Sequence, residues 1–564
     1  MKFNEYEYIR PDYDKVKEKY LNLINDFKNS TTADEQYSYL KRINALSNEV
    51  ETMSQLVCIR NSINTADEFY DKEKDYMDMT SPKFYGLRVE FYKQLLNSKF
   101  KEELKEKIHP QLITLAEMEI KTFSDEAVPL MQEENKLISE YDKLISSAKI
   151  EYDGKLLNLS QMQPYMESKD RRIRKEAHEK RSSFFKENEA KFDLIYDKLV
   201  KIRHQIALKL GFNNFTQLGY LRMGRSDYNS EDVRNFREHV LDYIVPITNE
   251  LRERQAKRIG VDEFKYYDIP LNFMSGNPAP KGNKEWIMER AKKMYEELSP
   301  ETHEFINIMI DKNLFDLETK PNKQAGGYCT FLHDYKVPFI FANFNGTQDD
   351  VTVVTHEAGH AFQTYQSRHF DAPEYSFPTS EAAEIHSMSM EFFTWPWMES
   401  FFEKDIEKFK FFHLADSLCF IPYGVTVDEF QHIVYGSPNM TPDERKKAWR
   451  DIEKKYTPYK DYDDNELLNK GTFWFRQGHI FASPFYYIDY TLALICSYQF
   501  WLRFKNNRKE AWEDYLKICK LGGSQSFLEI LKAGNLESPF EEVTINSVAS
   551  KIKEYLNSID DMKL

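Results

Sequence analysis

Apolar residues recur every three or four positions along most of this chain, which is the spacing of an amphipathic helix. The pattern is clearest from residue 12 to about residue 105, where Pro11 and Pro82 are the visible interruptions. Pro110 is placed to open one further long helix over 110–145, because proline is well tolerated in a first helical turn. The pattern predicts a mainly helical N-terminal part.

The helical pattern is first interrupted at residues 149–157. Residues 149–157 are expected to form two short strands around an Asp-Gly turn. Helical spacing then resumes and holds until Gly211, which is placed to end a helix. We therefore expect an N-terminal helical lobe over residues 1–160 and a catalytic domain over residues 161–564.

A second change of pattern follows Leu314. Residues 326–331 and 337–344 are rich in β-branched and aromatic residues, and an Asn-Gly turn ends the second stretch. From Val351 onward the spacing is helical again. The sequence predicts a small β-sheet directly before the helix that begins near Val351.

Composition restricts the classes of function. The 564 residues carry a net charge of -15, while 41% of them are hydrophobic, which is ample for a large core. A net negative charge repels phosphate backbones and acidic lipids, so we expect neither nucleic acid nor a membrane as a partner. Oligomeric state leaves no trace in the sequence.

The five cysteines are scattered, odd in number and free of any Cys-x-x-Cys pair. They indicate reduced thiols in a cytoplasmic protein. The N-terminus has no apolar run behind a basic start, so no signal peptide is expected. No stretch approaches about 18 consecutive apolar residues, so no transmembrane helix is expected either.

The strongest chemical pattern is His356-Glu357-Ala358-Gly359-His360. Two histidines four positions apart on a helix project from the same face and can bind one metal ion, typically zinc. Glu357 lies beside them and can face a bound water. Gly359 is unfavourable inside a helix by about 1 kcal/mol relative to alanine, which indicates close packing at that position.

A catalytic zinc site needs a further protein ligand and an open position for water. A second helix, capped by Thr379 or Ser380, carries several groups that could serve. From the residues alone the third ligand can be Glu381, Glu384, Glu391 or His386. The acids that do not ligate are expected to hydrogen-bond the ligating imidazoles.

His-Glu-x-Gly-His followed by such an acidic helix resembles the thimet oligopeptidase family, especially its oligoendopeptidase F and Pz-peptidase branch. The resemblance implies a third ligand about two dozen residues after the second histidine, which selects Glu384. It also implies that Glu391 is a supporting acid, and Glu381 is assigned the same role. The family cofactor is one zinc ion.

The resemblance extends from about Glu167 to the C-terminal region. It implies a large, two-lobed helical metallopeptidase fold that encloses a substrate channel, with the small sheet beside the metal-binding helix. The implied activity is hydrolysis of internal bonds in short, unfolded oligopeptides by a zinc-activated water, with Glu357 as the proton acceptor.

A peptide hydrolase also needs hydrogen-bond donors for the oxyanion that forms in the transition state. The family places a histidine and tyrosines in a loop similar to residues 478–490 here. By this resemblance His479, Tyr486 and Tyr490 are catalytic candidates. The spacing differs slightly from the family pattern, so the choice among Tyr486, Tyr487 and Tyr490 stays open.

Four residues of the β segments are candidates for substrate binding: Gly327, Ala342, Asn343 and Phe344. A strand over Ala342–Phe344 can offer an exposed edge that pairs with an extended peptide. The same stretch can equally be an ordinary inner strand.

Two other functions remain open from the sequence. One is a metallocarboxypeptidase on a related helical fold, which would need an arginine or lysine for the terminal carboxylate. Arg225 and Arg476 are candidates for that role. The other is an inactive peptide-binding scaffold, against which the intact motif argues.

Overall fold

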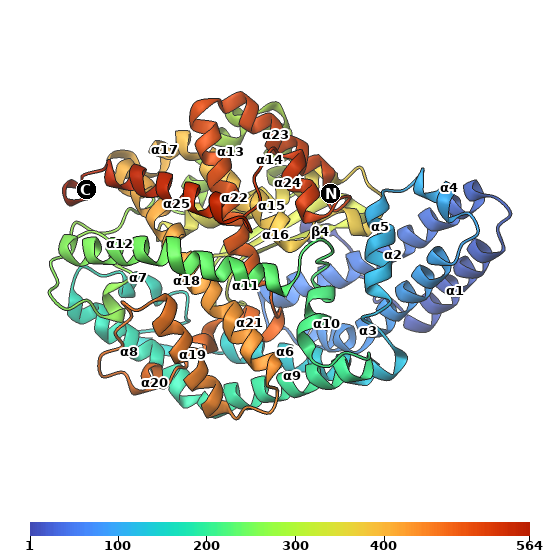
Figure 1. Cartoon of the computed structure of the whole chain (residues 1–564), viewed down its shortest axis with the longest axis horizontal. Coiled ribbons are helices and arrows are strands. Elements are labelled where there is room, and N and C mark those ends of the chain that lie inside the picture. The colour runs from blue at the N-terminus through green and yellow to red at the C-terminus, as the bar shows by residue number, and fades with distance from the viewer.

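The computed structural model describes residues 1–564 and is built almost entirely of helices (Figure 1). The predicted helical class is confirmed, with two small sheets added. No helix is both long enough and apolar enough to cross a lipid bilayer.

The N-terminal helices form a lobe at the right of Figure 1 with a core of its own. That core packs residues such as Phe27, Ile43 and Phe91, which are fully buried. The helices are α1 (Tyr13–Asn29), α2 (Ala33–Ile63), α3 (Glu68–Leu96), α4 (Lys101–Lys105) and α5 (Pro110–Glu119).

Pro82 does not interrupt the chain as expected but lies buried inside α3. Proline has no N–H, so the carbonyl four residues earlier loses its helical partner. That carbonyl belongs to Asp78, and it accepts a hydrogen bond from Nδ2 of Asn135 at 3.0 Å instead. A neighbouring helix thus replaces the missing bond, which a pattern along one helix does not reveal.

The helix predicted over 110–145 is two helices. Pro110 does open a helix, but α5 ends at Glu119, and α6 runs separately over Val128–Ser146. The hairpin that follows is as predicted: β1 (Ile150–Tyr152) pairs antiparallel with β2 (Lys155–Leu157). The boundary near residue 160 stays a prediction.

The middle of the chain continues as helices around the main core. They are α7 (Gln163–Met166), α8 (Arg171–Glu187), α9 (Glu189–Lys209), α10 (Phe215–Arg222), α11 (Ser230–His239), α12 (Val245–Arg258), α13 (Lys284–Leu298) and α14 (Pro300–Asp311). Gly211 follows α9 with a φ of 85°, so its predicted role in ending that helix is confirmed.

The second sheet has three strands in the order β3-β5-β4. The predicted strands are present as β4 (Tyr328–Leu332) and β5 (Val337–Phe344), which pair antiparallel. The sequence pattern missed β3 (Phe315–Glu318), which pairs parallel to β5. Parallel partners come from distant segments, so turn signals next to β5 do not predict them.

Of the two alternatives left open for Ala342–Phe344, an exposed edge or an inner strand, the structure shows the inner strand. These residues lie at the end of β5, the central strand, with Phe344 paired to Glu318 of β3. On the other side the preceding loop covers them, because Lys323 donates to the carbonyl of Ala342 and Asn343 donates to the carbonyl of Gly326 at 2.7 Å. The strands with a free edge are β3 and β4.

The C-terminal part consists of long and short helices that complete the main core. They are α15 (Asp349–Ser367), α16 (Ser380–Phe393), α17 (Glu399–Phe402), α18 (Ile406–Gly436), α19 (Pro442–Tyr456), α20 (Glu466–Asn469), α21 (Gly478–Ala482), α22 (Tyr487–Asn506), α23 (Arg508–Leu521), α24 (Phe527–Ala533) and α25 (Glu542–Asn557). Helix α16 is buried along almost its whole length and packs between α15 and α22.

Candidate metal centre

Helices α15 and α16 approach each other closely at Gly359. A Cβ atom built on this glycine would lie 2.6 Å from the carbonyl oxygen of His386 and 2.6 Å from Cα of Ser387. Such distances leave no room for any side chain, so the inference of close packing at Gly359 is confirmed. The contact holds the two helices in a fixed position relative to each other.

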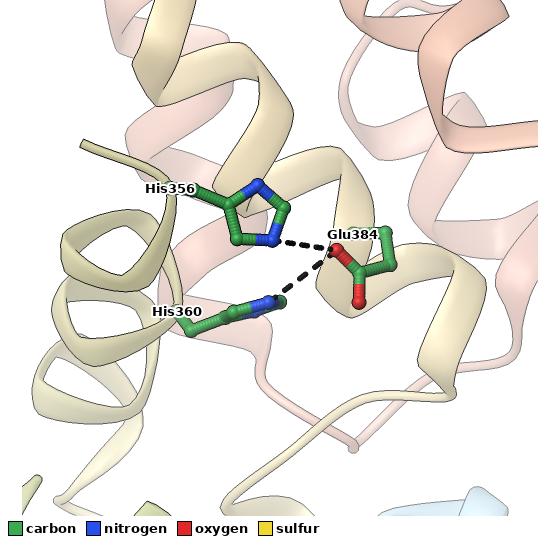
Figure 2. A group of neighbouring side chains, drawn as sticks. All are labelled: His356, His360 and Glu384. Atoms are coloured by element: carbon green, nitrogen blue, oxygen red, sulfur yellow. Dashed lines mark ion pairs between the residues drawn. The ribbon is translucent and has the colours of Figure 1, made fainter. Parts of the chain in front are cut away.

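That position brings the three expected ligands together (Figure 2). Nε2 of His356 lies 3.2 Å from Oε2 of Glu384, and Nε2 of His360 lies 3.4 Å from the same oxygen. The three potential ligand atoms all lie within 4.8 Å of one another. Two imidazoles and one carboxylate are the donor set of many catalytic zinc sites, so these residues fit the metal.

Two opposing effects, burial and the neighbouring imidazoles, act on the pKa of the Glu384 carboxyl. Burial alone would raise its pKa, but the facing imidazoles of His360 and His356 hold that pKa well below its usual range. The second oxygen, Oε1, accepts a hydrogen bond from the hydroxyl of Tyr486 at 2.6 Å. Ser387 donates to Oε2 at 2.8 Å. Glu384 is therefore an oriented, charged carboxylate.

His356 is oriented by a chain of hydrogen bonds on its other ring nitrogen. Its Nδ1 lies 2.7 Å from Oε1 of Glu391, as expected for a supporting acid. The other oxygen of Glu391 lies 2.7 Å from Nε2 of His413, whose Nδ1 accepts from the indole of Trp395 at 3.2 Å. A carboxylate on Nδ1 leaves Nε2 of His356 free to bind the metal.

Sequence reasoning missed His413. It lies on α18, 22 residues from Glu391, and no spacing rule connects a residue on one helix to its partner on another. Ser387 was also missed, although its position three residues after Glu384 on one helix is a signal that could have found it.

The expectation that Glu381 supports an imidazole is wrong. Neither of its carboxylate oxygens has a hydrogen-bond partner, and the opposite charge that acts on it most strongly is that of Arg225. Burial raises the pKa of Glu381 to about 6. The reason is rotation about the helix axis: Glu391 lies about 20° from Glu384, whereas Glu381 is turned by about 60°.

Glu357 lies on α15 between the two histidines and is 6% exposed. Its Oε2 is buried without a hydrogen-bond partner, and burial raises its pKa. A Cβ atom on Gly327 would come within 3.1 Å of its Oε1, so that glycine keeps the carboxylate accessible. A buried carboxylate with a free oxygen beside a metal-binding set is placed to accept a proton from water.

Two further residues complete the site, His479 of α21 and Tyr490 of α22. Nε2 of Gln477 donates to Nδ1 of His479 at 3.0 Å, and its Oε1 accepts from Tyr423 at 2.9 Å. Burial lowers the pKa of His479 to about 4, so the ring is neutral and carries its proton on Nε2. That nitrogen lies 3.0 Å from the hydroxyl of Tyr490. The proton of Tyr490 is therefore free for another acceptor.

These groups face a cavity of about 280 Å³. Its lining includes His356, His479, Tyr487 and Tyr490, whereas Tyr486 is turned toward Glu384. The structure thus brings the three expected ligands together, and one of them, His356, lines the same cavity as His479 and Tyr490. Ala342 and Phe344 are buried and take no part in lining it.

Comparison with protein families gives two matches on this chain. Residues 3–123 match the peptidase M3 N-terminal domain, and residues 164–549 match peptidase family M3. Among curated relatives, an oligoendopeptidase F homolog of Borreliella burgdorferi is 24% identical, over 75% of this chain and 74% of its own. Oligopeptidase PepF of Bacillus subtilis is 20% identical, over 71% and 59%.

Solved structures agree over the whole chain. A structure described as Pz peptidase A with inhibitor 2 is 55% identical, covers 100% of both chains and superposes with a TM-score of 0.99. An oligoendopeptidase F, described as putative, from Bacillus anthracis is 52% identical with a TM-score of 0.94, over 100% of this chain and 99% of that one.

Proposed function

This chain belongs to peptidase family M3 and is a metal-dependent oligoendopeptidase, and from that premise we propose that one zinc ion held by His356, His360 and Glu384 serves its reaction. The substrates are short, unfolded peptides cut at internal bonds. The observation that carries the proposal is the convergence of two imidazoles and one carboxylate beside the free oxygen of Glu357.

When bound, zinc supplies a Lewis acid that lowers the pKa of water and polarises a carbonyl. Glu357 accepts the proton of the attacking water on its free oxygen and returns it to the amine nitrogen that leaves. The raised pKa of Glu357 suits both steps. It makes the carboxylate a better proton acceptor, and the group still returns the proton readily near neutral pH.

Tyr490 is the donor to the carbonyl oxygen as negative charge develops there. The neutral ring of His479 holds the tyrosine oxygen through its Nε2 proton, which turns the tyrosine O–H toward the cavity. Tyr486 has a different task, since its hydroxyl holds the second oxygen of Glu384. This division is our proposal for the choice among the tyrosines, which the sequence left open.

The test is Glu357→Gln, which keeps the shape of the side chain and removes the base. We expect one zinc per chain to remain while kcat on a quenched peptide falls by about 10²–10⁴-fold. Glu381→Gln is the matched control, because Glu381 is an equally buried acid that contacts neither imidazole. Turnover by Glu357→Gln within a few-fold of the wild-type enzyme would refute the assignment.

A metallocarboxypeptidase reaction would need a cation at the cleavage site for the terminal carboxylate. Arg225 is unavailable, because its guanidinium pairs with Asp489 at 2.6 Å and both side chains are fully buried. Product analysis on peptides blocked at both ends separates the two activities, since only an endopeptidase cuts them.

We assign the enzyme to the cytoplasm. All five cysteines are free thiols, three of them buried, as expected where disulfides do not form.

A further inference from the structure

A second cavity, of about 260 Å³, adjoins the catalytic space. Asp416 and Phe420 of α18 line both cavities. Tyr423, one turn further along α18, lines the second cavity and donates to Gln477, the same residue that holds His479. The second cavity is therefore an extension of the active site.

Its walls carry an excess of positive charge. Four cations line it against a single acid, Asp416; the cations are Arg181, Arg252, Lys460 and Arg476. Lys460 pairs with Glu453 at 3.2 Å, outside the lining, and Arg252 lies 3.9 Å from Asp416. Arg181 and Arg476 form no ion pair with any acid of the chain. Burial and the charge of Arg476 lower the pKa of Arg181 to about 9.

Residues that line this space also carry unpaired polar atoms. Nε of Arg181 and Nε2 of His178, one helical turn apart on α8, are buried without a hydrogen-bond partner. Arg476 ends the short helix over Phe473–Arg476 and stacks on the ring of Phe473 at 3.7 Å. A buried guanidinium N–H is normally satisfied, so the free Nε of Arg181 near the unpaired cation of Arg476 indicates a negatively charged ligand.

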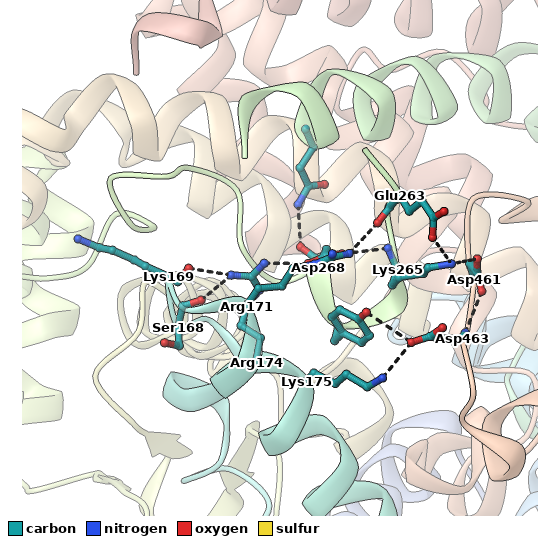
Figure 3. A network of polar contacts seen from close by, with 12 residues as sticks. Ser168, Lys169, Arg171, Arg174, Lys175, Glu263, Lys265, Asp268, Asp461 and Asp463 are labelled. Carbon is teal, nitrogen blue, oxygen red and sulfur yellow. Dashed lines mark hydrogen bonds and ion pairs between the residues drawn. The ribbon is translucent and has the colours of Figure 1, made fainter. Parts of the chain in front are cut away.

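The start of α8 shows that this chain pairs its cations elsewhere (Figure 3). Arg174 pairs with Asp268 at 2.8 Å, and Lys175 pairs with Asp463 at 3.1 Å. Two turns later on the same helix Arg181 has no such partner. Arg181, which lines the cavity, thus differs from the paired cations at the start of this helix.

The other walls are aromatic, with the rings of Tyr266, Phe420, Tyr423, Tyr459, Tyr462 and Phe473. Arginine binds carboxylates through two parallel hydrogen bonds, and aromatic rings accept apolar side chains. The C-terminal residue of a peptide has a carboxylate and can also carry an apolar side chain. Resting on the function proposed above, we propose that this cavity binds the C-terminal carboxylate of the peptide substrate, with Arg181 and Arg476 as its partners.

The proposal gives the enzyme a specificity rule. Because the terminal carboxylate is held at a fixed distance from the metal, the cleaved bond lies a fixed number of residues from the C-terminus. Lengthening a peptide at its N-terminus should therefore leave the length of the released C-terminal fragment unchanged, whereas residues added at the C-terminus should shift the cut by the same number.

The experiment compares two peptides of one sequence, one ending in a free carboxylate and the other in a carboxamide. For the zinc-loaded wild-type enzyme we expect KM to be lower for the acid by at least about tenfold, because hydrogen bonds between charged partners are strong. Arg476→Gln should remove most of this preference. Arg172→Gln, on the exposed face of α8, is the control and should keep the preference.

A direct binding measurement separates affinity from turnover. The acid peptide is titrated in a calorimeter into zinc-loaded Glu357→Gln protein and into the same protein that also carries Arg476→Gln. The second substitution should raise Kd by at least about tenfold. Arg476 is exposed, so this variant is expected to fold, and Arg181→Gln gives a second measurement.

The outcomes are distinct. Cleavage of neither peptide would contradict the proposed function itself. Cleavage of acid and amide with equal KM would overturn the carboxylate site and leave the proposed function intact. An amide peptide with an acidic side chain near its end that binds as well as the free acid would overturn the assignment to the terminal carboxylate.

Discussion

Gly359→Ala tests whether the packing of α15 against α16 fixes the metal ligands. Alanine favours a helix by about 1 kcal/mol over glycine, so without tertiary contact the substitution would stabilise the protein. In the structure the new Cβ would meet His386 and Ser387 at 2.6 Å and Met390 at 3.0 Å. The two shorter distances fall about 1 Å below the 3.5–4.0 Å optimum for non-bonded carbon atoms.

The two closest contact atoms are backbone on α16, so the helices must separate to relieve the overlap. Overpacking of this kind costs about 1–3 kcal/mol, which exceeds the gain in helix propensity. Separation by even half of the missing distance also moves Glu384 away from His356 and His360 by more than the tolerance of about 0.2 Å in metal–ligand distances. We expect zinc affinity to fall by at least about tenfold, equivalent to about 1.4 kcal/mol.

The assay is competition for zinc with a chromophoric chelator, together with thermal unfolding of the metal-free protein. Gly436→Ala is the matched control, because a Cβ at this helical glycine meets nothing within 4 Å. The control should keep its zinc affinity and unfold at the same or a slightly higher temperature. A Gly359→Ala protein with wild-type zinc affinity and an unchanged unfolding temperature would refute the argument.

Three other substitutions test single contacts. Tyr486→Phe removes the hydrogen bond to Glu384 and should lower kcat/KM by about 10–100-fold with zinc retained; loss of zinc instead would place the tyrosine in metal binding. Glu391→Gln should weaken zinc binding by about 10–100-fold in the chelator assay, and an unchanged affinity would contradict its role in orienting His356. Burial lowers the pKa of His386 to about 3, so between pH 6.5 and 5 the unfolded chain takes up a proton that the folded chain refuses, and stability falls by about 1.6 kcal/mol. The measurement is urea unfolding of the metal-free protein at both pH values. On going from pH 6.5 to 5, the free energy of unfolding of His386→Asn should fall by that amount less than that of the wild-type protein; an equal fall would show that His386 is not the cause.

Local features of the fold followed from the sequence because each depends on neighbouring residues. The hairpin at Ile150–Leu157, the end of α9 at Gly211 and the strands β4 and β5 all carry turn or cap signals. The predictions that failed depend on contacts from elsewhere. Pro82 stays helical because Asn135 of α6 replaces a hydrogen bond, and β3 pairs with β5 across a distance in the chain that no local signal spans.

The candidate site divides in the same way. Spacing along one helix places His356 and His360 on one face and puts Glu357 between them, so the chemistry of that helix could be predicted from the chain alone. The family resemblance supplied Glu384 and His479. It left the roles of the tyrosines open, because the choice between Tyr486 and Tyr490 depends on which hydroxyl is already bonded.

The sequence by itself determined the metal-binding helix and its base, since four residues make about one helical turn in any protein. Only the tertiary structure decided which acids turn toward the imidazoles, that His413 completes the chain behind them, and that Arg181 and Arg476 line a cavity without pairing with an acid. The physical reason is that a side chain's partners on other helices are set by packing, and the rotation of one buried helix against another is not encoded in either helix alone.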